Sequence, residues 1–119
     1  ATMDICNKYS TKIIQNKFRD FSSQRNLAMS MASMSHILFI DADEVLSEEL
    51  IGEIRKLKEE GFKNQVYTLH RITNFCGKWI KHGMWYPDKI QRLIKHGVAN
   101  WTGEVHEKLF FNTNYSFFY

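Results

Sequence analysis

The stretch Ile37-Leu38-Phe39-Ile40, followed directly by Asp41-Ala42-Asp43-Glu44, decides how this sequence folds. Four consecutive apolar residues are typical of a strand that is covered on both faces, as in the centre of a parallel sheet. The run ends at Asp41, where the carboxylates begin. We therefore expect a central parallel strand that places acidic residues at the end of a sheet, where open α/β sheets bind their ligands.

Helical patterns lie on both sides of this strand. Before it, Asp20 or Ser22 can cap a helix that runs to about Ser33, and after it Ser47 can cap a second helix that ends at Gly61. Such alternation of helix and strand predicts an α/β layer with parallel strands. A shorter helix and a short strand are expected at the start of the chain, over residues 2–9 and 12–15.

Both flanking helices have apolar residues at helical spacing, which predicts their buried faces. The face of the first helix is expected to contain Leu27, Met31 and Met34, with Ala28 and Ala32 beside them. The face of the second is expected to contain Leu50, Ile54 and Leu57. After Gly61, Phe62 is expected to fold back on Leu57 and close the helix.

The second half of the chain is rich in residues that favour strands, which we expect over residues 66–73, 78–81, 89–94 and 105–111. Gly and Pro residues separate these segments, as turns do. The predicted fold class is α/β, a mostly parallel sheet flanked by helices with a C-terminal antiparallel β-rich extension. Residues 1–119 form one expected domain, with residues 1–62 and 63–119 as its two halves.

The composition is that of a globular protein, with 119 residues, 44% of them hydrophobic, and a net charge of +3. This length suits one domain. The mild positive charge is compatible with a phosphate-bearing ligand or an anionic membrane surface but requires neither, and we expect no nucleic-acid partner. No apolar run is long enough to cross a membrane, and the polar first residues predict no signal peptide. Cys6 and Cys76 are expected to be free thiols in a reducing cytoplasm.

The carboxylates after the apolar run are the strongest chemical signal. In an extended segment residues two apart face the same way, so Asp41 and Asp43 would point into one crevice. Two carboxylates that close together resist joint ionisation unless a cation lies between them, and a hard divalent ion with oxygen ligands meets that need. The alternative is a pair of acids that merely open a helix from a surface loop.

Three segments carry a resemblance to a known family. Residues 21–54, which include "SHILFIDADEVLSEEL", resemble the donor-site core of bacterial family 2 glycosyltransferases. Residues 71–109 are similar to the WaaE-like subgroup that builds the lipopolysaccharide core, and residues 1–14 fit the helix and strand before the donor site. The resemblance implies a partial GT-A (Rossmann-like) fold. The family's opening strand with its Tyr-Asn-Glu motif and its nucleobase-reading Asp are missing, so we expect an N-terminally truncated chain that is inactive alone.

The resemblance also implies substrates and donor-site residues. It implies a nucleotide-sugar donor, with UDP-hexose as the expected class, and a glycan or lipid-linked saccharide acceptor. Asp43, with Asp41, would hold Mg²⁺ or Mn²⁺ on the donor diphosphate, and His106 would reach the metal or a phosphate. Arg25 and Asn26 would touch the nucleotide phosphate or ribose.

The acceptor side of the reaction needs other residues. An inverting transfer, which the family implies, requires a base that takes the proton of the acceptor hydroxyl. The candidate bases are Asp88, Glu104 and Glu107, and the two glutamates are favoured. The candidate acceptor-binding residues are Trp85, Tyr86 and Arg92. The alternative for this aromatic stretch is the packing of a small β-region.

Two alternatives to a transferase stay open. A phosphatase of the haloacid dehalogenase type would use Asp41 as its nucleophile, although that motif normally opens its domain. A non-catalytic binding or assembly module would fit an incomplete donor pocket. The lipid-linked acceptors of similar enzymes imply a cytoplasmic location with peripheral association at the inner face of the plasma membrane. Missing first strands would expose a sheet edge, through which we expect self-association.

Overall fold

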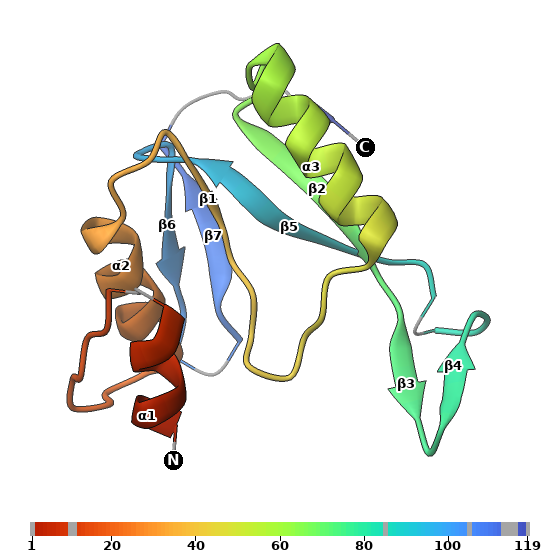
Figure 1. The fold of residues 1–119 in the computed structure, drawn as a ribbon, viewed down its shortest axis with the longest axis horizontal. Helices are drawn as coiled ribbons and strands as arrows, with labels where there is room; N and C mark the ends of the chain where they lie inside the picture. The colour runs from red at the N-terminus through yellow and green to blue at the C-terminus, as the bar shows by residue number, and fades with distance from the viewer. Residues whose placement is uncertain (1, 10–11, 85, 105, 113–116, 119) are drawn as a thin grey trace.

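The computed structural model describes residues 2–9, 12–84, 86–104, 106–112 and 117–118 (Figure 1). Its helices are α1 (Thr2–Cys6), the 3₁₀ helix η1 (Asn7–Tyr9), α2 (Phe21–Met31) and α3 (Glu48–Glu60). Its strands are β1 (His36–Leu38), β2 (Val66–Arg71), β3 (Thr73–Phe75), β4 (Lys78–Ile80), β5 (Asp88–Lys95), β6 (Ala99–Thr102), β7 (Lys108–Phe111) and β8 (Phe117–Phe118). All the described helices precede β2, so the first half of the chain is mainly helical and the second half is mainly β.

The described strands form one sheet in the order β1-β5-β2-β8 and two hairpins, β3-β4 and β6-β7. Strand β5 runs antiparallel to both β1 and β2, and β2 and β8 are the parallel pair. The prediction of a mostly parallel sheet is therefore wrong for the described strands. β1 is a half-buried edge strand of this sheet and not a central parallel one.

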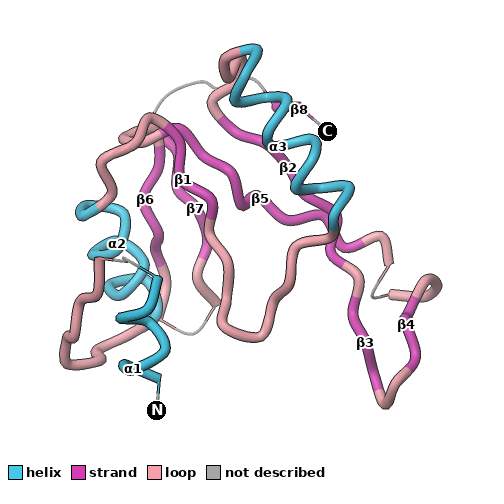
Figure 2. The backbone as a smooth tube through the Cα atoms, in the orientation of Figure 1, coloured by secondary structure: helices cyan, strands magenta, loops and turns pink. Residues whose placement is uncertain are grey.

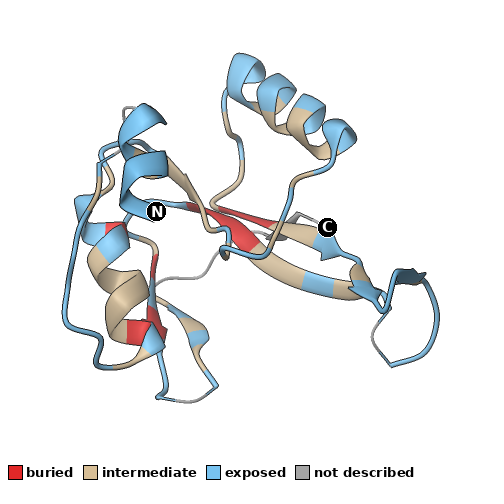
Figure 3. Ribbon diagram, turned by 60° about the horizontal axis from the view of Figure 1, so that its bottom comes forward, coloured by how far each residue is buried: buried red, intermediate tan, exposed pale blue. Residues whose placement is uncertain are grey.

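The core lies where the four-stranded sheet meets the β6-β7 hairpin. Val66 on β2, Ile94 on β5 and Ala99 on β6 are its buried centre. Partly buried apolar side chains pack around them, namely Phe39, Val98, Leu109 and Phe111. Figure 3 shows buried residues along these strands and on α2, whereas the β3-β4 hairpin has none. The apolar run therefore continues past β1 as a loop that still packs on the core through Phe39.

Helix α2 begins at the predicted cap, because the Asp20 carboxylate accepts a hydrogen bond of 2.7 Å from the Ser23 N–H. Its buried face differs from the predicted one. The buried residues of the helix are Ser22 and Met29, whereas Met31 is exposed. Met34, beyond the helix, is also exposed. The difference arises because this face of α2 forms hydrogen bonds with the backbone of the β6-β7 hairpin, and these bonds bury Ser22.

Asn26 is the main link between α2 and β6. Its side chain accepts from the Trp101 N–H and donates to the Trp101 carbonyl, each at 2.8 Å. One turn earlier, the Ser22 hydroxyl donates to the Gly103 carbonyl at 2.5 Å. Gly103 has φ of 101°, and a Cβ there would lie 2.8 Å from the His106 carbonyl oxygen, so this tight turn requires glycine.

Helix α3 also begins at its predicted cap, where the Ser47 hydroxyl accepts from the Leu50 N–H at 3.2 Å. The predicted stripe of Leu50, Ile54 and Leu57 is half-buried, and no residue of α3 is fully buried. Beyond the helix, the ring of Phe62 stacks on His36 of β1 with 4.2 Å between centroids. This contact joins the end of α3 to the edge of the sheet.

Other predictions meet a mixed outcome. Residues 12–15 lie in irregular chain, so the strand expected there is wrong. Strand β6, and all of β3 beyond Thr73, lie where no strand was predicted. The strand expected at residues 105–111 is confined to β7 among its described residues. Cys6 and Cys76 are free thiols, as predicted. In the described part of the chain, no helix combines the length and apolar character that a membrane span needs.

Candidate functional site

The Asp41–Glu44 segment forms a turn in the long loop between β1 and α3 (Figure 2). The Glu44 N–H donates to the Asp41 carbonyl at 3.0 Å, and the Asp41 N–H donates to Glu44 Oε2 at 2.9 Å. The predicted pairing of Asp41 with Asp43 assumed an extended backbone, which the turn replaces. Glu44 therefore lies beside Asp41, and Asp43 is exposed.

Arg92 is buried on β5 and joins the two carboxylates of this turn. Its Nη2 donates to Asp41 Oδ2 and to Glu44 Oε1, both at 2.9 Å. The Phe39 N–H donates to the Arg92 carbonyl at 2.9 Å, so backbone pairing just beyond β1 holds the turn and the arginine together. The other terminal nitrogen, Nη1, is buried and has no hydrogen-bond partner within the described residues.

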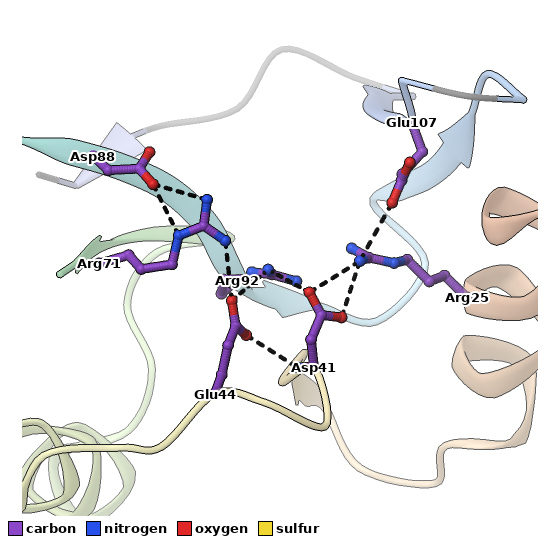
Figure 4. Close-up of polar contacts among 7 residues, drawn as sticks. All are labelled: Arg25, Asp41, Glu44, Arg71, Asp88, Arg92 and Glu107. Atoms are coloured by element: carbon purple, nitrogen blue, oxygen red, sulfur yellow. Dashed lines mark hydrogen bonds and ion pairs between the residues drawn. The ribbon is translucent and has the colours of Figure 1, made fainter. Parts of the chain in front are cut away.

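Arg25 reaches the same turn from α2. Its Nη2 lies 3.0 and 3.2 Å from the two oxygens of Asp41 and 3.3 Å from Glu107 Oε1. Its guanidinium carbon lies 4.5 Å from the centre of the Trp101 ring, at cation–π distance. Figure 4 shows Arg25 between Asp41 and Glu107. Because Asn26 fixes α2 to β6 at Trp101, the neighbouring Arg25 is held in a defined direction.

Arg71, the last residue of β2, extends the group on its other side. It faces Asp88 in the β2-β5 register, and its Nε donates to Asp88 Oδ2 at 2.8 Å. Its Nη1 donates to Glu44 Oε1 at 3.1 Å. Seven residues thus form one continuous ion-pair cluster (Figure 4), namely Arg25, Asp41, Glu44, Arg71, Asp88, Arg92 and Glu107.

Proton affinities within the ion-pair cluster follow its charges. Partial burial would by itself raise the pKa of Asp41, but the hydrogen bond and charge of Arg92, with the charges of Arg25 and Arg71, outweigh it and hold that pKa below its usual value. Burial would likewise lower the pKa of Arg71, but its bonds to Asp88 and Glu44 raise it. Asp41 is therefore ionised at neutral pH.

The ion-pair cluster has three guanidinium groups and four carboxylates, which leaves a single negative charge. Guanidinium groups bind phosphate oxygens with the same forked geometry that they use for carboxylates. A phosphate-bearing ligand could therefore take the place of a carboxylate partner at Arg25 or Arg92. The guanidinium groups, and not the net charge of the cluster, are what an anionic ligand would bind.

The predicted metal ligands do not come together as a metal centre. Within the described residues, no group of three or more His, Cys, Asp or Glu side chains is placed to share an ion. Both oxygens of Asp41 already accept from arginines, and Asp43 and His106 are exposed. As they lie, these residues do not fit a bound divalent ion.

The remaining predicted residues take different places. Asn26 is occupied by the backbone of Trp101 and so is not free for a nucleotide. Glu104 is exposed and lines an open depression with residues 18–21, outside the ion-pair cluster. Tyr86 is exposed before β5, and Trp85 lies outside the described residues. Asp88, Arg92 and Glu107 are the predicted acceptor-side residues that the ion-pair cluster unites.

A family model described as glycosyl transferase family 2 matches residues 1–115 of this chain. The chain belongs to glycosyl transferase family 2. This family 2 domain therefore has a GT-A, Rossmann-like α/β fold, and it is a transferase that uses a nucleotide-sugar donor and an acceptor. Membership also removes the reason for assigning Asp41 to a phosphatase. No solved structure matches the chain.

Three residues were not predicted from the sequence: Glu44 and Arg71, which belong to the ion-pair cluster, and Trp101, whose ring lies against Arg25. Glu44 lies in the acidic stretch itself. If a turn had been predicted there instead of an extended segment, Glu44 would have been placed beside Asp41. No sequence pattern indicates a role for Arg71, because only the pairing of β2 with β5 places it opposite Asp88. Trp101 follows the Gly97 turn on β6, a strand that the sequence analysis did not predict.

Proposed function

We propose that this family 2 glycosyltransferase moves a hexose from a UDP-sugar to a glycan, with inversion at the anomeric carbon. We further propose an acceptor of the lipopolysaccharide-core class, as in the WaaE-like subgroup that residues 71–109 resemble. The proposal rests mainly on the ion-pair cluster, because this cluster joins residues from both halves of the segment that matches the family.

The arginines of the ion-pair cluster would bind the donor diphosphate. Arg25 is half-buried and clamped between Asp41, Glu107 and the Trp101 ring, so its guanidinium group is already oriented. Arg92 is buried, and a charged donor in a water-poor site stabilises a phosphate oxygen more strongly than in bulk water. As the sugar leaves, negative charge grows on the nucleoside diphosphate, and these fixed positive groups would stabilise it.

Glu107 is the best-placed candidate for the general base. An inverting transfer needs a carboxylate that accepts the proton of the acceptor hydroxyl. Among the described residues, Glu107 has one ion pair, at 3.3 Å, with the arginine that we assign to the diphosphate. Asp88 is bound by Arg71 at 2.8 Å, which weakens it as a base, and Glu104 lies outside the ion-pair cluster. Tyr86, with Trp85, remains the proposed acceptor-binding pair.

The metal requirement is a separate proposal. Enzymes of this family commonly use a divalent ion, and Asp41 and Asp43 are the ligands that the sequence predicts for Mg²⁺ or Mn²⁺, with His106 as a further candidate. Binding through Asp41 would require this carboxylate to exchange Arg25 or Arg92 for the ion. We therefore assign no step of the transfer to a metal.

The cellular setting is also proposed. A lipid-linked acceptor would bring the protein to the inner face of the plasma membrane from the cytoplasm. Self-association would use the edge of β1 that no described strand covers. Sedimentation velocity tests this point, and a monomer at high concentration would exclude it.

Calorimetric titration of the chain with UDP, GDP and ADP, with and without Mn²⁺, tests the donor site. We expect UDP to bind, and Arg25→Gln to weaken that binding about 10-fold or more, because a charge-assisted hydrogen bond contributes roughly 1.5–3 kcal/mol. Arg55→Gln on the exposed face of α3 is the matched control. Asp43→Asn tests the metal, since binding that needs Mn²⁺ and is lost in this variant would establish the ligand.

Two outcomes would contradict the proposal. Equal affinity of the Arg25→Gln and Arg55→Gln variants for UDP would remove the diphosphate role of the ion-pair cluster. No binding of any nucleotide to the folded chain, with or without Mn²⁺, would favour a non-catalytic binding module.

A further inference from the structure

The β3-β4 hairpin projects away from the rest of the molecule (Figure 1). Its strands pair only with each other among the described strands, through Thr73↔Ile80, Asn74↔Trp79 and Phe75↔Lys78. Cys76 and Gly77 form its two-residue turn with φ of 48° and 80°, the positive values that a tight hairpin requires. The hairpin is thus a regular and well-formed arm.

The exposed side chains of this arm are unusually apolar. Phe75 is 59% exposed and Trp79 is 63% exposed, although such large rings are normally buried. Met84, on the segment that follows β4, is fully exposed. Because opposite residues share a face of an antiparallel pair, Phe75 lies on the face of Thr73 and Ile80, whereas Trp79 lies on the other face with Asn74. An aromatic ring therefore stands on each face near the tip.

The charged residues of this arm are all basic. Residues 72–84 include Lys78, Lys81 and His82 and no Asp or Glu. Lysine side chains beside aromatic rings are typical of segments that lie in the headgroup region of a membrane, with apolar atoms inserted and ammonium groups near lipid phosphates.

We propose that the β3-β4 hairpin docks this protein on an anionic lipid bilayer, with Phe75 and Trp79 inserted and Lys78 and Lys81 against the headgroups. This rests on the proposed function in one respect, since it names the part of the chain that brings the site to a lipid-linked acceptor. The positions of the rings favour a bilayer over a protein partner. A protein surface covers one face of a hairpin, whereas a lipid interface surrounds both faces at the tip.

The base of the hairpin leads straight to the ion-pair cluster. Arg71 ends β2 two residues before Thr73 begins β3, and Asp88, its partner at 2.8 Å, begins β5. A membrane that holds the tip of the hairpin would therefore hold the acceptor side of the site at a fixed height above the lipid surface.

Vesicle binding of the 119-residue chain tests the proposal. Vesicles of phosphatidylcholine with about one third phosphatidylglycerol supply the negative surface, and phosphatidylcholine alone is the control. With Cys6→Ser in place, a polarity-sensitive dye on Cys76 reports insertion of the tip directly. We expect binding and a blue shift of the dye on anionic vesicles only. Lys78→Gln with Lys81→Gln should weaken binding roughly 30-fold, because each basic residue near such a surface contributes about a factor of five.

The aromatic variant separates this site from nonspecific adhesion. Phe75→Ser with Trp79→Ser should abolish the blue shift, whereas Val45→Ser with Phe110→Ser, at apolar positions elsewhere that are at least as exposed, should leave it unchanged. Circular dichroism establishes that each variant folds. Equal loss in both pairs, or no binding of the wild-type chain to anionic vesicles, would overturn the proposal.

Sedimentation velocity distinguishes a protein partner of the hairpin from a lipid bilayer. A dimer in the absence of lipid that the Phe75→Ser, Trp79→Ser variant converts to a monomer would assign the arm to a protein surface and refute the membrane assignment. These experiments use no nucleotide, and the donor titration uses no lipid. Failure of one therefore leaves the other standing.

Discussion

Replacing Arg92 by Gln is the sharpest test of the ion-pair cluster. The Arg92 side chain is only 7% exposed, and one of its nitrogens bonds to both Asp41 and Glu44 at 2.9 Å. Removing one partner of a fully buried ion pair costs about 3–5 kcal/mol. Here Asp41 is 42% exposed and keeps its ion pair with Arg25, and Glu44 keeps its ion pair with Arg71. Each carboxylate therefore retains one arginine partner, which reduces the cost. We therefore expect a loss of about 2–3 kcal/mol in the free energy of unfolding.

Arg71→Gln provides the matched control. Arg71 contacts the same oxygen of Glu44 from the neighbouring strand, but its side chain is 42% exposed. Exposed ion pairs contribute about 0–1 kcal/mol, so this variant should lose less than half as much stability as Arg92→Gln. Both variants remove one positive charge and keep a polar side chain, which leaves burial as the main difference between them.

Urea denaturation followed by tryptophan fluorescence measures both losses, with the slope against urea as a check that the unfolded states are comparable. A double mutant with Asp41→Asn should give a coupling energy of roughly 1 kcal/mol with Arg92. Equal losses for the two arginine variants, or a loss below about 0.5 kcal/mol for Arg92→Gln, would refute the assignment of Arg92 as the central cation of the ion-pair cluster.

Two further predictions concern the same region. Asn26→Ala should lower the free energy of unfolding by about 2 kcal/mol and should also weaken UDP binding, because it breaks both 2.8 Å bonds to Trp101 that orient Arg25, and a stability loss with unchanged affinity would contradict this positioning role. The stabilising effect of Asp41 should disappear in acid: its folded-state pKa lies below the unfolded value of about 3.9, so its contribution is complete above that value and is lost as the pH falls through the lower folded pKa. The difference in unfolding free energy between the wild-type chain and Asp41→Asn should therefore shrink below about pH 4, and a constant difference down to pH 2 would count against the arginine contacts.

Local signals in the sequence located the helices well. Asp20 and Ser47 cap α2 and α3 as predicted, because a cap depends on a side chain and a backbone group three residues away. Val66 and Ile94 likewise lie within predicted strands, where β-branched residues dominate. These features need no knowledge of distant parts of the chain.

Pairing direction and the buried face of α2 depended on distant contacts instead. The apolar run at Ile37 looks the same beside a parallel or an antiparallel neighbour, and only the β5 register shows that the neighbour is antiparallel. α2 hides Ser22 and Met29 and exposes Met31, because its partners are backbone groups of β6 that hydrophobicity cannot indicate.

The candidate site could be predicted only in part, because some of its members depend on contacts that local sequence patterns do not indicate. Asp41 and Arg25 were found from the acidic stretch and the family resemblance, and Glu107 and Arg92 from the acceptor-side segment. Glu44 was missed because its role depends on a turn two residues long, and the extended interpretation had already assigned its place to Asp43.

The segments that build the ion-pair cluster are far apart along the chain. Asn26 and Trp101, which orient Arg25, are separated by 75 residues, and Asp41 and Arg92 by 51. Contacts at such separation form late, because the intervening loop must close before they stabilise anything. A ribosome that has released only the helices and β2 would therefore carry a nascent chain whose acidic turn still lacks its buried partner, Arg92. The site is then complete only after β6 and Glu107 have emerged, so the chain cannot acquire its binding chemistry before the strands that hold the site have been made.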